Sequence, residues 1–275
     1  MSGLTSIRAR RRGRFPGMVM ALLPLALVAA CAGELPAVAP PPKAHLHVYL
    51  LLGQSNMAGR GLLNETNRLP TDRVLKFTAD NRWAPAVEPL HFDKPTIAGA
   101  GLGMSFARAM ADAEPSVTIG LVPCAVGGTP LERWMKGADL YEAALVRARL
   151  AMKDGTLKGI LWHQGEGDAG TEEKARSYAA RLARMVTDLR ADLGAGDVPF
   201  VAGKLGEFAS KESKSGKSSL RPVVNEQIAA IGRLVPRAAA VESAGLGDKG
   251  DGTHFDTPAL REFGLRYAKA MKALK

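Results

Sequence analysis

Ser55, Asp251 and His254 are residues whose types and spacing could together perform nucleophilic catalysis. A serine hydroxyl is a poor nucleophile unless a base takes its proton as it attacks. Asp251 and His254 are three residues apart, so a single turn can set the carboxylate against one imidazole nitrogen and leave the other to face Ser55. Asp248 is a competing carboxylate, but its spacing to His254 is less suitable. The pattern indicates a serine hydrolase with Ser55 as nucleophile and His254 as base.

Each of these residues also has an ordinary structural role open to it. Ser55 follows an apolar run and could cap a helix, Asp251 could stabilise a turn, and His254 could be a surface or core histidine. A lone Asp-x-x-His pattern is weak evidence by itself. Asp256 is expected to be the N-cap of the last helix.

Hydrolysis through a serine also requires donors that meet the oxyanion. The Ser55 amide could supply one, and the amide of Gly127 or Gly128 a second, because only glycine lets backbone approach so closely. The side-chain amide of Gln164 could supply a third, and each such donor is typically worth ~3 kcal/mol in the transition state. Three neighbouring polar residues are expected to support the site: Gln54, Asn56 and Glu166.

A metal site is the alternative interpretation of His163, Glu166 and Asp168. Their spacing fits no common zinc pattern and cysteine ligands are lacking, so neither a metal nor another cofactor is expected. Glu166 is instead expected to hydrogen-bond backbone and fix the loop of Gln164. Cys124 lies in an apolar run and is expected to be a small buried core residue rather than a nucleophile.

The elements that must position these residues alternate between short apolar runs and longer amphipathic ones. Strands are predicted over 47–52, 117–122, 159–162, 198–202 and 238–241. Helices are predicted over 103–113, 138–153, 171–193, 221–234 and 257–273, with Thr171 capping the third. Buried strands alternating with helices predict a three-layer α/β/α domain of about five parallel strands. Such sheets place active sites at the carboxyl ends of their strands, where the polar glycine-rich segments of this chain lie.

The length of 275 residues, with 46% hydrophobic and 23% charged residues, suits one domain with a sizeable core. The net charge of +10 is concentrated at the amino end, where five arginines precede residue 31 with no acidic residue among them. Without them, 32 basic and 27 acidic residues remain, mostly scattered. Scattered charge is typical of a solvated surface, so no nucleic-acid partner is expected.

Residues 1–30 are predicted to be a signal peptide, because a basic stretch precedes an apolar run at 18–30 that is too short to span a membrane. Small residues before Cys31 resemble a lipoprotein cleavage site, which makes Cys31 the expected lipidation site. Residues 31–44 form a Pro/Ala-rich tether, expected to stay extended and unpacked, and residues 45–275 the catalytic domain. We expect an exported, membrane-anchored bacterial lipoprotein, periplasmic or at the cell surface, or a secreted protein if Cys31 is not lipidated.

Several segments in order along the chain resemble the SGNH hydrolases, and in particular carbohydrate esterase family 6, which is grouped with the sialate O-acetylesterase (SASA) domain family. They are GQSNM at 53–57, GLGMSFARAMA at 101–111, GLVPCAVGGTPLERW at 120–134, GILWHQGEGDA at 159–169 and DGTHF at 251–255. The resemblance implies a flavodoxin-like fold and metal-free ester hydrolysis. It also implies the roles suggested above for Ser55, Asp251 and His254, with Gln164 in the oxyanion hole.

The resemblance implies an acetyl esterase acting on acetylated xylan or O-acetylated sialic acid. Deacetylation of the cell's own wall sugars and a non-catalytic carbohydrate-binding lipoprotein are the alternatives. The connections at 60–100 and 206–220 are expected to rim the site. Trp83, Phe92 and Trp134 could stack on a sugar or simply pack in the core.

Overall fold

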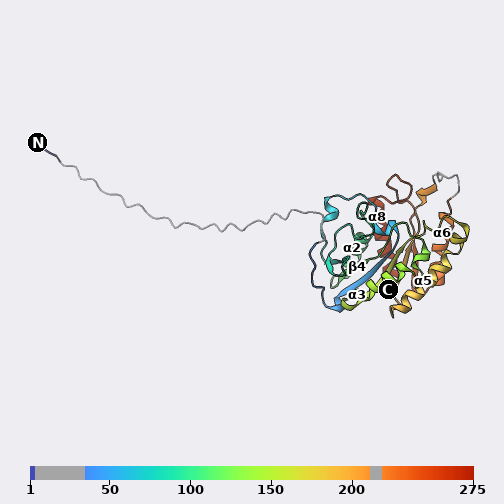
Figure 1. Cartoon of the computed structure of the whole chain (residues 1–275). Coiled ribbons are helices and arrows are strands. Elements are labelled where there is room, and N and C mark those ends of the chain that lie inside the picture. Colours follow the sequence, from blue (N-terminus) through green and yellow to red (C-terminus); the bar gives the residue numbers. More distant parts are fainter. Residues whose placement is uncertain (4–34, 211–218) are drawn as a thin grey trace. The chain divides into compact units, whose positions relative to one another are not determined.

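The computed structural model describes residues 1–3, 35–210 and 219–275 (Figure 1). The expected signal-peptide core and Cys31 lie outside the described residues. Residues 35–42 have no regular secondary structure, yet the Val38 amide donates to the Trp83 carbonyl at 2.8 Å. The expected tether is therefore not wholly unpacked, because it reaches an edge strand whose backbone offers an unpaired acceptor.

One sheet of seven strands forms the centre of the domain, in the order β3-β2-β4-β1-β5-β6-β7. The strands are β1 Leu46–Gly53, β2 Val74–Phe77, β3 Trp83–Pro85, β4 Thr118–Pro123, β5 Thr156–His163, β6 Phe200–Gly203 and β7 Ala238–Val241. All neighbouring pairs are parallel except β2 with β3. The prediction of about five strands was too low, because the short β2–β3 hairpin extends one edge. Without that hairpin the order is the flavodoxin-like one.

The helices cover both faces of the sheet, as predicted. They are α1 Ser55–Ala58, α2 Gly103–Ala113, α3 Asp139–Asp154, α4 Glu172–Arg176, α5 Tyr178–Asp192, α6 Arg221–Ala229, α7 Ile231–Leu234 and α8 Thr257–Ala273. Two predicted helices are each divided in two, at Ser177 and at Ala230. The predicted caps are confirmed, since Thr171 accepts from the Lys174 amide and Asp256 from the Ala259 amide.

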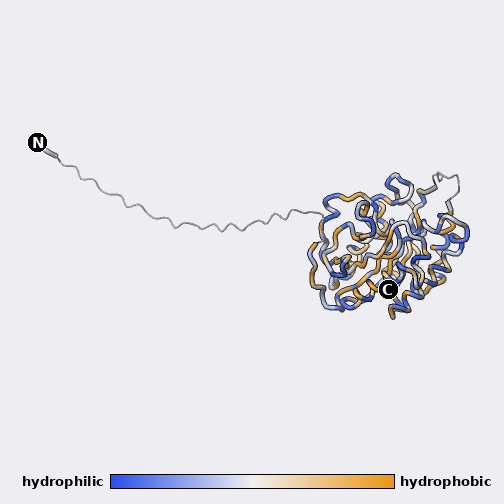
Figure 2. Tube along the Cα trace, viewed as in Figure 1, coloured by the Kyte–Doolittle hydropathy of each residue, from blue (hydrophilic) through white to orange (hydrophobic). Residues whose placement is uncertain are grey.

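Strand β1 shows how the two layers of core are built. The even-numbered residues from Leu46 to Leu52 pack with α3, α5 and α6 on one face of the sheet. Tyr49 and Leu51 pack with α2 and α8 on the other face. This alternation follows from the two-residue period of a strand that is buried on both faces. Figure 2 shows the apolar residues gathered along the central strands and the hydrophilic ones along the outer helices and loops. The three-layer α/β/α prediction is confirmed.

Within the described part of the chain, we find no helix that is both long enough and apolar enough to cross a membrane.

Candidate active site

Ser55 begins the short helix α1, two residues after the carboxyl end of the central strand β1. The turn between them is tight, because Gly53 has φ of +129° and the Gln54 amide donates to the His163 carbonyl at 2.9 Å. A Cβ on Gly53 would lie 2.1 Å from that same carbonyl oxygen, so only glycine fits here. Ser55 is thereby held at the sheet edge where parallel α/β folds bind ligands.

The loop before α8 brings His254 and Asp251 to this serine. His254 Nε2 lies 3.0 Å from Ser55 Oγ, and His254 Nδ1 lies 2.7 Å from Asp251 Oδ2. These are hydrogen-bond distances, and they link the three side chains in the order of a Ser-His-Asp triad. With Nδ1–H donated to the carboxylate, Nε2 is left to accept the serine proton.

The Asp251 carboxylate is fixed by its own turn. Its Oδ1 accepts from the backbone amides of Thr253 at 2.9 Å and His254 at 2.8 Å. Partial burial disfavours the charged form, but the hydrogen bonds from His254 and the two amides outweigh it and lower the pKa of Asp251 to about 2. Asp248, the competing carboxylate, instead accepts from the Gly252 amide at 2.6 Å. Of the two, Asp251 is the carboxylate on the imidazole.

Asn56 joins the serine turn to the histidine loop. Its Nδ2 donates to Glu166 Oε1 at 2.7 Å and to the Thr253 carbonyl at 3.1 Å, and its Oδ1 accepts from the Phe255 amide at 3.1 Å. Glu166 was expected to bind backbone, and the structure corrects this: its bonded oxygen accepts from Asn56. The reason is that Asn56 is only 1% exposed, so its side-chain amide needs a hydrogen-bond acceptor within the protein, and Glu166 provides one.

The other predicted supporting residue, Gln54, is also buried next to the serine. Its Oε1 accepts from the Gly167 amide at 3.3 Å, on the loop after β5. Gln54 therefore ties the serine turn to that loop, as Asn56 ties it to the loop before α8.

Some of the donors predicted for the oxyanion hole already donate to other groups of the protein. The Gly127 amide donates to Asp93 Oδ2 at 2.7 Å, and Gln164 Nε2 donates to the Thr129 carbonyl at 3.0 Å and to Asp168 at 2.8 Å. Both groups are thus engaged as the structure places them, and Gln164 is fully buried.

Two amides of the predicted hole are not engaged. Among the described residues, the backbone N–H groups of Ser55 and Gly128 have no hydrogen-bond partner. Gly128 is exposed and has φ of +80°, a conformation that favours glycine. These two amides are the free candidates for meeting an oxyanion.

Two buried charged residues at this site were not identified from the sequence. Arg60 Nη2 lies 2.6 Å from Asp93 Oδ2, and the two side chains are 2% and 1% exposed. Arg60 follows the serine segment closely, but a charged residue in a loop is ordinarily solvated, and Asp93 lies in a stretch that we read as a rim. A pairing over 33 residues leaves no local pattern in the sequence.

The residues considered for a metal site do not converge. Asp168 accepts from Gln164, from the Leu131 amide and from Arg181, and His163 Nδ1 lies 3.3 Å from the Tyr267 hydroxyl. Within the described ranges, no group of three or more His, Cys, Asp or Glu side chains is arranged to hold a metal ion.

The aromatic residues considered for sugar stacking have different surroundings. Trp83 and Trp134 are 3% and 1% exposed, and their indole nitrogens donate to Asp154 and Thr129 respectively, so both are core residues. Phe92 is half-buried beneath two cationic side chains. Cys124 is also partly buried, and burial raises the pKa of its thiol to about 11, which suits the predicted inert role.

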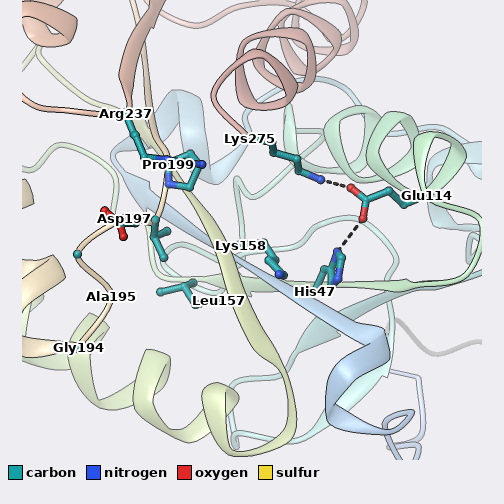
Figure 3. Close-up of a pocket in the computed structure, with 12 residues that line it drawn as sticks. His47, Glu114, Leu157, Lys158, Gly194, Ala195, Asp197, Pro199, Arg237 and Lys275 are labelled. Atoms are coloured by element: carbon teal, nitrogen blue, oxygen red, sulfur yellow. Dashed lines mark hydrogen bonds and ion pairs between the residues drawn. The ribbon is translucent and has the colours of Figure 1, made fainter.

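A hollow of about 540 Å³ lies elsewhere, at the amino ends of β1 and β5 (Figure 3). Its wall includes His47, Lys158 and the last residue Lys275, and Figure 3 shows the Glu114 carboxylate between His47 and Lys275. None of the predicted site residues lines it. Parallel strands carry their active sites at the opposite ends, so this hollow is separate from the serine site.

Comparison with known proteins relates the whole domain to carbohydrate esterases. Residues 45–273 match the model of the family described as carbohydrate esterase, sialic acid-specific acetylesterase. An Arabidopsis thaliana protein described as a probable carbohydrate esterase is 35% identical over 242 residues, covering 81% of this chain and 89% of the plant protein. A solved structure from Arabidopsis thaliana matches with a TM-score of 0.75 and 32% identity, over 85% of this chain and 99% of that chain.

Two more distant solved structures share the fold. A carbohydrate acetylesterase from Xanthomonas citri has a TM-score of 0.62 at 22% identity, over 83% of this chain and 56% of that one. A structure described as a GDSL-like lipase from Parabacteroides merdae has a TM-score of 0.55 at 13% identity, over 86% of this chain and 100% of that one. The expected α/β/α fold is shared with both of these structures.

Proposed function

This chain belongs to the carbohydrate esterase family of sialic acid-specific acetylesterases, and from that membership we propose that it removes O-acetyl groups from an acetylated sugar with Ser55 as nucleophile. Membership of this family identifies the protein as a carboxylic ester hydrolase. The observation that carries the catalytic assignment is the continuous hydrogen-bonded path from Ser55 Oγ through the His254 imidazole to Asp251. No other serine of the matched segments is aligned in this way with an imidazole and a carboxylate among the described residues.

The proposed reaction has two steps. Ser55 Oγ attacks the acetyl carbonyl carbon while His254 Nε2 takes the hydroxyl proton, and the resulting imidazolium is stabilised by the Asp251 carboxylate. The imidazolium then gives the proton to the sugar oxygen as the carbon–oxygen bond breaks, which leaves an acetyl group on Ser55. A water molecule, deprotonated by His254, attacks that ester, and acetate leaves as the serine recovers its proton.

The substrate class that we propose is an acetylated carbohydrate of the xylan or sialic-acid type. This substrate class is supported by the family match. We also propose that the chain falls within carbohydrate esterase family 6. The buried positions of Trp83 and Trp134 remove two stacking platforms, so recognition of the sugar is left to the loops around the serine.

Export with a lipid anchor at Cys31 remains part of the proposal. It is supported by the sequence alone, through the arginine-rich start, the apolar run at 18–30 and the small residues before Cys31. Under this proposal the membrane contact is through the lipid, and the esterase domain faces the periplasm or the cell exterior, where it would meet its proposed carbohydrate substrate.

The substrate proposal is tested by comparing acyl chain length and sugar. Release of nitrophenol from acetate, butyrate and octanoate esters is measured beside acetate release from acetylated xylan, O-acetylated sialic acid and acetylated wall glycan. We expect activity to fall from acetate to octanoate and acetate to be released from xylan or sialic acid. Activity that rises toward octanoate, or release from the wall glycan alone, would contradict the proposed substrate.

A further inference from the structure

The ion pair of Arg60 and Asp93 and the side chain of Ser55 all lie close to Gly127. A Cβ added to Gly127 would meet Arg60 Nη2 at 2.6 Å, Asp93 Oδ2 at 3.0 Å and Ser55 Cβ at 3.5 Å. The space beside Gly127 is therefore shared by the nucleophile and the ion pair. A side chain on Gly127 would have to displace the Arg60 guanidinium of this ion pair, whereas its contact with Ser55 would be an ordinary one.

One oxygen of Asp93 holds two donors. Its Oδ2 accepts from Arg60 Nη2 at 2.6 Å and from the Gly127 amide at 2.7 Å, while Oδ1 is buried without a hydrogen-bond partner. Arg60 is itself anchored, since its Nη1 donates to the Gly59 carbonyl at 2.8 Å. Charge-assisted bonds of this length are strong and directional. The Gly127 peptide is thus held in one orientation by an anchored carboxylate.

Two other bonds complete the fixation of the 126–129 turn. The Val126 amide donates to the Gly53 carbonyl at 2.9 Å, and the Thr129 hydroxyl donates to the Val126 carbonyl at 2.8 Å. The next amide along the turn, that of exposed Gly128, is left without a partner among the described residues. Lys94 Nζ lies 4.0 Å from the position that a Gly128 Cβ would take, which adds positive charge beside this amide.

We propose that Asp93, anchored by Arg60, is a positioning residue of the oxyanion hole: by binding the Gly127 amide it fixes the turn so that the Gly128 and Ser55 amides receive the oxyanion. The inference rests on the proposed role of Ser55. Arg60 neutralises a carboxylate that would otherwise repel a developing oxyanion nearby. Preplaced donors need no reorganisation as the charge develops, so the benefit appears in kcat rather than in KM.

Asp93→Asn and Asp93→Ala test whether Asp93 acts through the two hydrogen bonds that its Oδ2 accepts, because only the asparagine can keep those bonds. The asparagine oxygen can replace Oδ2 and accept both bonds, and its NH₂ then takes the place of the unpartnered Oδ1. Alanine removes both bonds. Asp80→Ala is the matched control, because Asp80 lies in the same stretch and is paired with Arg82 at the exposed surface.

The measurement is kcat and KM for 4-nitrophenyl acetate on the full chain, together with inhibition by a boronic acid that forms a tetrahedral adduct on serine. We expect Asp93→Ala to lower kcat by roughly 10- to 100-fold with KM nearly unchanged, and to weaken the boronate by a similar factor. Asp80→Ala should stay within about threefold of the wild type in both readouts, and Asp93→Asn should recover most of the loss seen in Asp93→Ala, because the asparagine oxygen can still accept from the Gly127 amide.

The inference is overturned if folded Asp93→Ala matches or exceeds the wild-type kcat, since the carboxylate would then be dispensable or would block the hole. If Asp93→Ala fails to fold, Asp93→Asn decides the question. The inference is then overturned if folded Asp93→Asn loses as much kcat and boronate affinity as the loss of one oxyanion-hole donor would cause. Ser55→Ala in the same assay keeps the two proposals apart. Full activity in Ser55→Ala refutes the proposed function, whereas its inactivity beside an active Asp93→Ala refutes only the role of Asp93.

Discussion

Asp251 is the carboxylate in contact with the imidazole, although Asp248 lies on the same loop. The difference is one of hydrogen bonding: Asp251 accepts from His254 Nδ1 and from two amides of its own turn, whereas Asp248 accepts from the Gly252 amide. The spacing of three residues predicts this arrangement, because one turn is enough to bring the side chains together. The choice between the Gly127 and Gly128 amides as the proposed oxyanion donor could not be predicted in the same way, because it depends on Asp93, which is distant in sequence and binds the Gly127 amide.

Asp251→Asn is expected to lower kcat for 4-nitrophenyl acetate by roughly 10²- to 10⁴-fold, because an amide no longer stabilises the imidazolium or holds the required tautomer. Asp248→Asn is the matched control, since asparagine can still accept from the Gly252 amide, and it should change kcat by less than about threefold. Steady-state kinetics of the two variants provides the comparison. Equal losses in both would contradict the assignment of Asp251.

The lowered pKa of Asp251 gives a pH dependence of stability with a definite sign. Its pKa is about 2 in the folded protein against an ordinary value of 3.8, so its contribution is complete above the ordinary value and is lost as the pH falls through about 2. The difference in unfolding free energy between wild type and Asp251→Asn should be constant above about pH 5 and shrink below about pH 4. Urea unfolding over this range measures it. A difference that stays constant down to about pH 2.5 would show that Asp251 is not the titrating group.

At the scale of elements, the proposed active site depends on three loops being held in register. Asn56 is the residue that connects α1 to the segment before α8, through Thr253 and Phe255, and it also binds Glu166 after β5. Asn56→Ala would leave the Phe255 amide and the Glu166 carboxylate without their partner. Unpaired buried polar groups of this kind cost about 1–3 kcal/mol each.

We therefore expect Asn56→Ala to lower the free energy of unfolding by about 2–4 kcal/mol and to reduce kcat as well. Asn64→Ala is the control, because Asn64 caps an exposed 3-10 helix and its loss should cost about 1 kcal/mol without affecting kcat. Urea unfolding and kinetics of both variants make the test. An Asn56→Ala protein with wild-type kcat would mean that the loops hold their register without it.

The same scale shows what the sequence could and could not predict. Strands β1, β4, β5, β6 and β7 are apolar on both faces, and their runs appear directly in the sequence. The hairpin of Val74–Phe77 with Trp83–Pro85 is too short for such a pattern and carries a lysine at Lys76. The divisions at Ser177 and Ala230 interrupt patterns that stay amphipathic throughout, so periodicity alone did not reveal them.

At the scale of the whole molecule, the charge of the chain is unevenly distributed. The arginines before residue 31 belong to the proposed export signal, so they would not contribute to the mature protein. The esterase domain then carries a modest excess of positive charge. Under the proposed export, processing at Cys31 would remove five of the ten net positive charges.

Cys31→Ser is expected to abolish lipidation and move the protein from the membrane fraction to the soluble fraction of a Gram-negative expression host. The reason is that the proposed membrane contact is the lipid on Cys31, and serine lacks the thiol to which the lipid would be attached. Metabolic labelling with a fatty-acid analogue and fractionation provide the readout, with Cys124→Ser as control because Cys124 is partly buried within the folded domain. Labelling that survives in Cys31→Ser would refute the anchor.

The most direct test of the central claim is acetate release by the wild type and by Ser55→Ala, measured with 4-nitrophenyl acetate and with an acetylated sugar. Ser55 lies 3.0 Å from His254 Nε2, and the whole reaction is assigned to its hydroxyl. We predict that the wild type turns over and that folded Ser55→Ala loses roughly 10³-fold or more in kcat. Equal release by the two proteins, or no release by a folded wild type, would contradict the assignment of Ser55 as the nucleophile of an acetyl esterase.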